Sequence, residues 1–165
     1  MALLSLDELV ALRETWRASG LRLVLTNGVF DVLHAGHVRY LEQARALGDV
    51  LVVALNSDAS TRAIKGPLRP VTPQADRAAV LGALRAVDHV TLFDQPTAEA
   101  VVSALRPDVY VKGGDYATLE QAPDLARLPE ARIVAAQGGQ VVLLPYAEGQ
   151  STSAIIRRIV ERYGR

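Results

Sequence analysis

Short apolar segments that end in polar residues alternate with amphipathic segments along this chain, and this alternation limits the fold more than any other feature. The segment 22–25 reads RLVL before Thr26-Asn27-Gly28, and 50–55 reads VLVVAL before Asn56-Ser57-Asp58. Short, uninterrupted apolar runs of this kind are typical of strands that are buried on both faces of a parallel sheet. The chain is therefore expected to be an α/β protein.

The remaining segments extend the same pattern. Further strands are expected at 89–93, 108–111 and 141–144, and helices at 7–19, 37–46, 74–86, 97–105, 130–137 and 153–162. The order predicts a Rossmann-like, open, parallel five-stranded sheet with helices on both faces. Residues 59–72 contain Gly66, Pro67 and Pro70 and are expected to form an exposed loop. No repeat or linker divides 1–165, so we expect one domain, with an N-terminal helix in 1–20 and a core in 21–165.

Composition excludes several classes of function. Eighteen basic residues balance eighteen acidic ones, which gives no support for a nucleic-acid partner or a membrane surface. The chain has no cysteine and only three histidines, so disulfides, a thiol nucleophile and a histidine-based transition-metal site are not expected. No apolar run approaches the roughly 20 residues that span a bilayer. A cytoplasmic location is the expectation.

The polar residues that follow the strands are expected to meet at one edge of the sheet. They are 26–37 after the first strand, 56–58 after the second and Lys112-Gly113-Gly114-Asp115 after the fourth. In open parallel sheets, ligands bind beyond the carboxyl ends of the strands, near the point where the strand order reverses. The sequence therefore predicts a binding site at this edge.

His34 and His37 are the strongest candidates for chemistry within it. They are three residues apart where a glycine-containing loop enters a helix, so both rings can face one ligand at the helix N-terminus. That end attracts anions through free N–H groups and the helix dipole, and Gly36 allows close backbone approach. In the alternative, one histidine is exposed and the other caps the turn.

The segment GVFDVLHAGH resembles the G-x-F-D-x-x-H-x-G-H signature of the cytidylyltransferase-like nucleotidyltransferases. The stretches NSDASTRAIKGPLRPV, DRAAVLGAL, RPDVYVKGGDY and EGQSTSAIIRRI are similar to the adenylyltransferases of ADP-heptose synthesis, which in many bacteria form the second domain of a bifunctional protein with a sugar kinase. The resemblance implies transfer of AMP from ATP to D-glycero-D-manno-heptose 1-phosphate, with Mg²⁺ and release of pyrophosphate. It further implies a stand-alone enzyme without the kinase and a homodimer, since family members often dimerise.

The resemblance also implies roles for individual residues. The catalytic set is His34, His37, Lys65 and Arg77. Acceptor binding falls to Asn56, Asp58 and Arg69, with Asp31 either helping to hold the metal ion or fixing the loop by hydrogen bonds. The nucleotide-binding set comprises Thr26, Asn27, Gly28, Val29, Phe30, Gly36, Lys112, Gly113, Asp115, Ser151, Thr152 and Ser153.

Some of these roles have structural alternatives. Lys65, Arg69 and Arg77 are each open to interpretation as surface charges, and Lys112 to Asp115 as a simple turn. Ser151 to Ser153 precede the last expected helix, so they either cap it, hold a phosphate, or do both.

Two other functions stay open. Glycerol-phosphate cytidylyltransferases carry an arginine in R-T-x-G-I-S-T-T, where this chain reads YAEGQSTS without it, which favours ATP over CTP. The rivals within the same reaction are CTP with glycerol 3-phosphate or another alcohol phosphate, and adenylylation of FMN. The rival from another class is a nucleotide-binding regulator that has lost catalysis.

Overall fold

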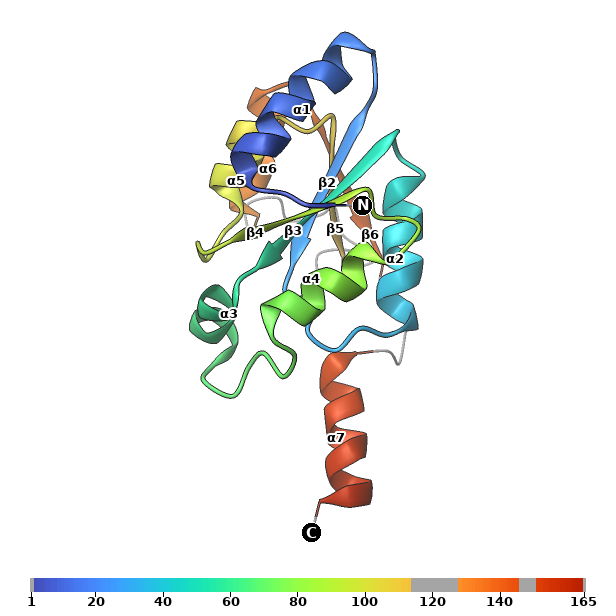
Figure 1. Ribbon diagram of the computed structural model, residues 1–165, viewed down its shortest axis with the longest axis vertical. Helices are drawn as coiled ribbons and strands as arrows, with labels where there is room; N and C mark the ends of the chain where they lie inside the picture. Colours follow the sequence, from blue (N-terminus) through green and yellow to red (C-terminus); the bar gives the residue numbers. More distant parts are fainter. Residues whose placement is uncertain (1, 114–127, 146–150, 165) are drawn as a thin grey trace.

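Six parallel strands form one sheet in the part of the chain that the computed structural model describes, which is residues 2–113, 128–145 and 151–164 (Figure 1). Their order across the sheet is β1-β4-β3-β2-β5-β6. The sheet thus continues in one direction from β2 to β3 and β4, and in the other from β2 to β5 and β6. The strands are β1 (Ala2–Leu3), β2 (Leu23–Gly28), β3 (Val50–Asn56), β4 (His89–Phe93), β5 (Val109–Gly113) and β6 (Gln140–Leu144).

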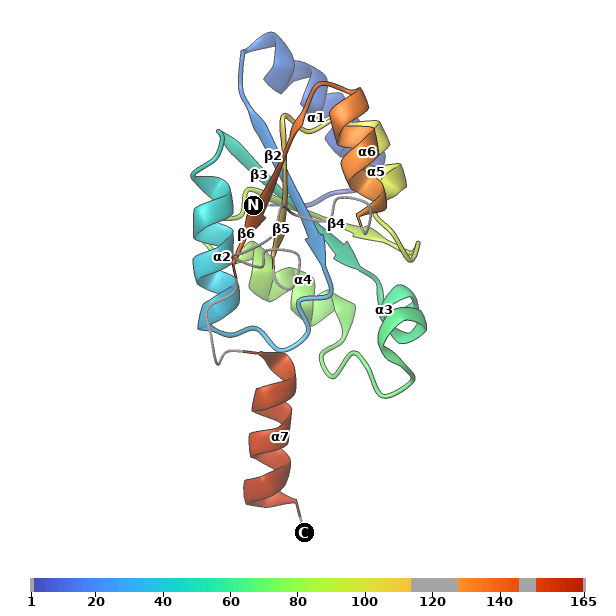
Figure 2. The ribbon, with the colours of Figure 1, turned by 180° about the vertical axis from the view of Figure 1, so that it is seen from behind.

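Helices cover both faces of this sheet (Figures 1 and 2). On one face lie α1 (Leu6–Ala18), α5 (Glu99–Leu105) and α6 (Pro129–Ala136), and on the other α2 (Ala35–Arg45) and α4 (Gln74–Gly82). Two more helices, α3 (Asp58–Lys65) and α7 (Thr152–Tyr163), lie beyond the carboxyl ends of the strands, and α7 projects away from the sheet.

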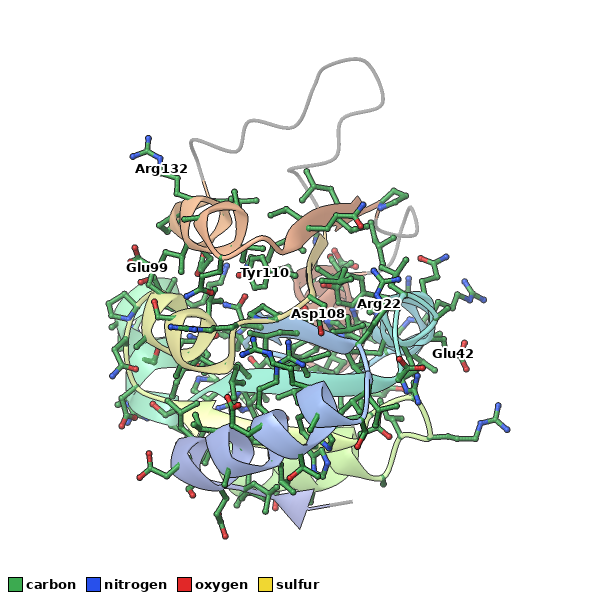
Figure 3. All side chains as sticks on the ribbon, turned by 90° about the horizontal axis from the view of Figure 1, so that it is seen from above. Arg22, Glu42, Glu99, Asp108, Tyr110 and Arg132 are labelled. Atoms are coloured by element: carbon green, nitrogen blue, oxygen red, sulfur yellow. The ribbon has the colours of Figure 1, made fainter. Side chains whose placement is uncertain are left out.

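Each face of the sheet has its own hydrophobic core. Alternate side chains of one strand enter opposite cores, so Leu23 and Leu25 pack toward α1, α5 and α6, whereas Val24 packs toward α2 and α4. All seven residues of β3 are buried, as expected for a central strand with helices on both sides. Figure 3 shows the protein from above, with side chains filling the space between the twisted sheet and the helices around it.

The structure confirms the α/β fold, the parallel sheet and the five strands expected from the sequence. It adds β1, whose two residues pair with His89 and Val90 of β4 at the edge of the sheet. A strand of two residues is too short to leave a pattern in the sequence.

One expectation was wrong. The segment 59–72 is not a loop throughout, because α3 occupies Asp58–Lys65 and the loop begins at Gly66. The Ser57 side chain accepts a hydrogen bond from Ser60 N and thereby caps the helix, while Gly66 ends it at φ 94°. The glycine and prolines that suggested a loop all lie after the helix.

The reversal of strand order lies between β2 and β5. Leaving out the short β1, the five other strands follow the arrangement of a doubly wound sheet, with later strands added on either side of β2. The carboxyl ends of β2 and β5 are therefore where a ligand crevice is expected. None of the helices within the described residues is long and apolar enough to cross a bilayer.

Candidate active site

A cavity of about 550 Å³ opens at this reversal, beyond the carboxyl ends of the strands. Its walls come from β2, β3 and β5, from the loop before α2, and from residues near the ends of α2, α3, α5, α6 and α7. A volume of this size lies within the range of small-molecule sites.

The loop after β2 forms one wall through an unusual backbone conformation. Phe30 has φ 44°, in the left-handed region that residues other than glycine rarely adopt. A side chain at Gly28 would begin 3.0 Å from the Phe30 ring, so the glycine makes room for this turn. Backbone strain of this kind is concentrated at functional sites in proteins.

His34 occupies the N-cap position of α2, where its ring nitrogen Nδ1 accepts a hydrogen bond from Gly36 N at 3.1 Å. An accepting nitrogen carries no proton, so the neutral ring holds its proton on Nε2. Burial lowers the pKa of His34, which favours this neutral form. His34 can therefore donate one hydrogen bond from Nε2 while its other nitrogen holds the helix end.

His37 lies one helical turn further along and faces His34. The centroids of the two imidazole rings are 3.9 Å apart, and the centroid of the Phe30 ring lies 5.4 Å from that of His37. Burial, together with the charge that a protonated His34 would carry, lowers the pKa of His37 to about 4. Both imidazoles are thus neutral near pH 7, and each is able to act as an N–H donor.

Lys112, on β5, lines the cavity, and its side chain links β5 to β2. Its Nζ donates to Asn27 Oδ1 at 2.9 Å, and the Tyr110 hydroxyl donates to the same oxygen at 2.6 Å. Burial lowers the pKa of Lys112, and the nearby Glu130 carboxylate partly offsets that effect. The predicted residues Asn27 and Lys112 therefore meet at the strand reversal.

Arg69 and Asp31 form an ion pair at the edge of the cavity, with Arg69 Nε 2.6 Å from Asp31 Oδ2. The other oxygen, Oδ1, accepts hydrogen bonds from Val71 N and Thr72 N. Both oxygens of this buried carboxylate thus bind the loop that follows α3. This arrangement matches the expectation that Asp31 fixes the loop by hydrogen bonds more closely than the expectation that it helps to hold a metal ion. Within the described residues, no three His, Asp or Glu side chains cluster in a way that would hold a metal ion.

Arg77 takes a different position from the one expected for a phosphate ligand. Its side chain is fully buried, and its guanidinium donates to the carbonyl oxygens of Thr72 and Val29 and to Asp58 Oδ1 at 2.8 Å. Neither Arg77 nor Asp58 lines the cavity. The structure thus does not bring these two predicted residues to the cavity: the pair connects α3, α4 and the loop after β2.

Most of the other predicted residues do meet at the cavity, including Lys65 at the end of α3. Thr26 and Gly36 lie behind its wall: Thr26 is hydrogen-bonded to the Tyr40 hydroxyl at 2.7 Å, and Gly36 to His34. Asp115, together with Gly114, lies outside the described residues. The predicted residues that line the cavity are Asn27, Gly28, Val29, Phe30, Asp31, His34, His37, Asn56, Lys65, Arg69, Lys112, Gly113, Ser151, Thr152 and Ser153.

Sequence reasoning missed several residues of the cavity wall. Tyr40 follows His37 by three residues, so the helix spacing could have placed it on the same face. Thr97 and Glu130 come from the beginnings of α5 and α6, which are far apart in sequence and meet only through helix packing. The sequence contains no local signal for that meeting.

Comparison with known proteins identifies the family. The family model described as cytidylyltransferase-like matches residues 25–158, which is most of the chain. The chain belongs to the cytidylyltransferase-like family, and it is an enzyme of the nucleotidyltransferase type.

Two curated relatives are similar to this chain over nearly its whole length. The chain is 51% identical over 160 residues to the bifunctional protein HldE of Streptomyces coelicolor, an alignment that covers 97% of this chain and 33% of the relative. It is 47% identical over 158 residues to the bifunctional protein HldE of Wolinella succinogenes, covering 95% of this chain and 31% of the relative. The chain thus spans about a third of the length of these relatives.

A solved structure shares the fold. The lipopolysaccharide core biosynthesis protein from Thermoplasma volcanium matches with a TM-score of 0.60 and 30% sequence identity. The match covers 79% of this chain and all of the other.

Proposed function

We propose that this protein transfers AMP from ATP to D-glycero-D-manno-heptose 1-phosphate, giving ADP-heptose and pyrophosphate. The observation that carries the proposal is the pair of neutral, facing histidines at the N-terminus of α2, on the wall of a cavity at the strand reversal. The choice of substrates is supported by the segments that resemble adenylyltransferases of ADP-heptose synthesis and by the two HldE relatives.

The proposed reaction is a direct in-line displacement. An oxygen of the sugar phosphate forms a bond to the α-phosphorus of ATP, and the bond from that phosphorus to the bridging oxygen breaks, so the electron pair leaves with pyrophosphate. The attacking group is already an anion, so no protein nucleophile is needed. Catalysis then rests on positioning and on stabilisation of phosphate charge.

The residues at the cavity suit this task. His34 and His37 are proposed to donate to the phosphates, with Lys65 and Arg69 adding positive charge beside them. The N-termini of α2 and α7 supply further N–H groups, and Ser151 to Ser153 begin α7 there. Lys112 and Gly113 are proposed to border the nucleotide. We propose that Arg77 positions the loops and does not touch substrate.

Mg²⁺ enters this proposal as part of the substrate, bound to the phosphates of ATP. The proposed place of action is the cytoplasm, where ATP is made available to biosynthetic enzymes. We also carry forward the homodimer as a proposal, because Ile159, Val160 and Tyr163 of α7 expose apolar surface that a second chain would cover.

A matrix of nucleoside triphosphates against phosphorylated acceptors tests the function, with pyrophosphate release as the readout. We expect release with ATP and the heptose 1-phosphate, and little with CTP and glycerol 3-phosphate or with ATP and FMN. Release with CTP alone would contradict the assignment.

Two variants distinguish an enzyme from a silent nucleotide-binding protein. His34→Ala and His37→Ala should each lower turnover by roughly 100- to 1,000-fold, the usual effect of losing a donor to developing charge. Circular dichroism should show that both variants fold. Full turnover in both would contradict the placement of the active site.

A further inference from the structure

We propose that Glu130 forms a subsite that binds hydroxyl groups of the acceptor sugar. The proposal rests on the function proposed above and extends it by naming a residue that selects polyol phosphates. It places the sugar at the α5–α6 side of the cavity, opposite the histidines.

Glu130 is a buried carboxylate, and one of its oxygens has no hydrogen-bond partner among the described residues. The residue is 3% exposed, and its Oε1 accepts a hydrogen bond from Ala98 N at 2.9 Å. Its Oε2 accepts none from the described residues, although the side chain lines the cavity. Hydrogen-bond donors strongly stabilise buried carboxylate oxygens. A ligand that brings an O–H group to this place would supply the missing donor to Glu130 and would itself be held by that hydrogen bond.

The Lys112 ammonium leaves this oxygen available. Lys112 is close enough for the Glu130 carboxylate to oppose the lowering of its pKa, yet its ammonium donates to Asn27. The lysine thus moderates the negative charge without occupying the second oxygen. A neutral hydroxyl donor fits this arrangement, because no positive group has to be displaced.

The distribution of charge in the cavity separates two kinds of ligand group. His34 and the N-terminus of α7 lie together, since Thr152 Oγ1 donates to Val32 O in the loop before α2. Glu130 belongs to α6, which packs with α5 on the opposite face of the sheet (Figures 1 and 2). A carboxylate repels phosphate oxygens but accepts from hydroxyls, so phosphates are directed to the first region and the polyol to the second.

Thr97 completes the polar part of this wall. Its hydroxyl donates to Glu99 Oε2 at 2.8 Å, so the lone pairs of the Thr97 oxygen are left to accept from a sugar hydroxyl. Thr97 directly precedes Ala98, whose N–H is held by Glu130. Both residues line the cavity, and the hydrogen bond from Ala98 N to Glu130 holds them close together.

The variant Glu130→Gln tests the subsite, because the amide oxygen can still accept from Ala98 N while the charge and the second acceptor are lost. We expect the KM for the heptose 1-phosphate to rise by about 10-fold or more, the effect of removing a hydrogen bond to a charged group. The KM for ATP should stay within about two-fold of the wild-type value. The inhibition constant of ethyl phosphate, measured as a competitor of the acceptor, should also be unchanged because this probe has no hydroxyl group.

Glu42→Gln is the matched control, since Glu42 is an exposed residue of α2 and does not line the cavity. An unchanged acceptor KM in Glu130→Gln, or an equal rise in Glu42→Gln, would overturn the subsite. A wild-type protein that ignores every sugar 1-phosphate contradicts the proposed function instead. The same comparison is then made with the acceptor that the substrate matrix identifies, and an unchanged KM for a hydroxyl-bearing acceptor overturns the subsite there too.

Discussion

The hydrogen bonds that surround His34, Asp31 and Arg77 determine how these side chains are protonated or where they lie. For His34, the hydrogen bond from Gly36 N to Nδ1 defines which ring nitrogen carries the proton. Asp31 and Arg77 show the same dependence. Each is a charged residue that the surrounding loops hold in place and that holds those loops in turn.

Replacing Arg77 tests this positioning role. Arg77→Met should lower the free energy of unfolding by about 3 kcal/mol, because the buried carbonyls of Val29 and Thr72 lose their donor and Asp58 loses its partner. Denaturant titration measures the change. The exposed Arg85, changed to Met, should stay within about 0.5 kcal/mol of wild type. Equal stability of the two variants would contradict the role given to Arg77.

The difference between Arg77 and Lys112 shows what could be predicted at this scale. Lys112 follows a strand directly, so strand direction alone brings it to the site. Arg77 lies in the first turn of α4, and the sequence pattern does not tell whether its guanidinium turns toward the cavity or into the protein. Glu130 could not be found at all, because its place depends on how α6 packs against α5. Strand ends are readable from sequence, whereas side-chain direction and helix packing are not.

Among the elements, the sheet followed from the sequence more fully than the helices around the site. The five longer strands are marked by uninterrupted apolar runs, and each was expected within a few residues of its observed bounds. The helix α3 was missed because its eight residues are polar over much of their length and lead into a glycine- and proline-rich loop. As a result, Lys65 lies at the end of a helix and lines the cavity, whereas the sequence placed it in an exposed loop.

The helix α7 has two roles that a pair of substitutions can separate. Ser151 caps the helix by accepting from Ala154 N at 3.1 Å, and it also lines the cavity. Ser151→Asn and Ser151→Asp both keep a good N-cap, but only the aspartate places negative charge beside the proposed phosphate region.

We therefore expect similar helix content in the two variants by circular dichroism, with a KM for ATP about 10-fold higher in Ser151→Asp than in Ser151→Asn. If both variants have the same KM, Ser151 acts as a cap only. If Ser151→Asp binds ATP more tightly, the phosphates do not lie near the start of α7.

At the scale of the whole molecule, a histidine of the candidate active site makes the stability of the protein depend on pH. The pKa of His37 is about 4 in the folded protein against an ordinary value of 6.5, so the unfolded chain binds the extra proton first. The contribution of His37 to stability is complete above pH 6.5 and is lost as the pH falls toward 4. Burial also lowers the pKa of His34 and of His89, so neither reverses this trend.

Denaturant titrations at pH 7 and pH 4.5 measure this effect. The loss of unfolding free energy between the two should be smaller in His37→Gln than in wild type, by about 1 kcal/mol after allowance for solvent screening of a partly exposed ring. Equal losses in the two proteins would show that His37 is protonated as readily in the folded state as in the unfolded chain.

The residues that line the cavity run from Asn27 to Ser153, so the cavity wall is completed late in the synthesis of the chain. The strands of the sheet are complete once Leu144 has left the ribosome, so the nascent chain can pack both of its cores at that stage. The wall that Ser151 to Ser153 supply does not exist until later. A chain halted between these points would contain the residues of both cores but would lack the part of the cavity wall that Ser151 to Ser153 form.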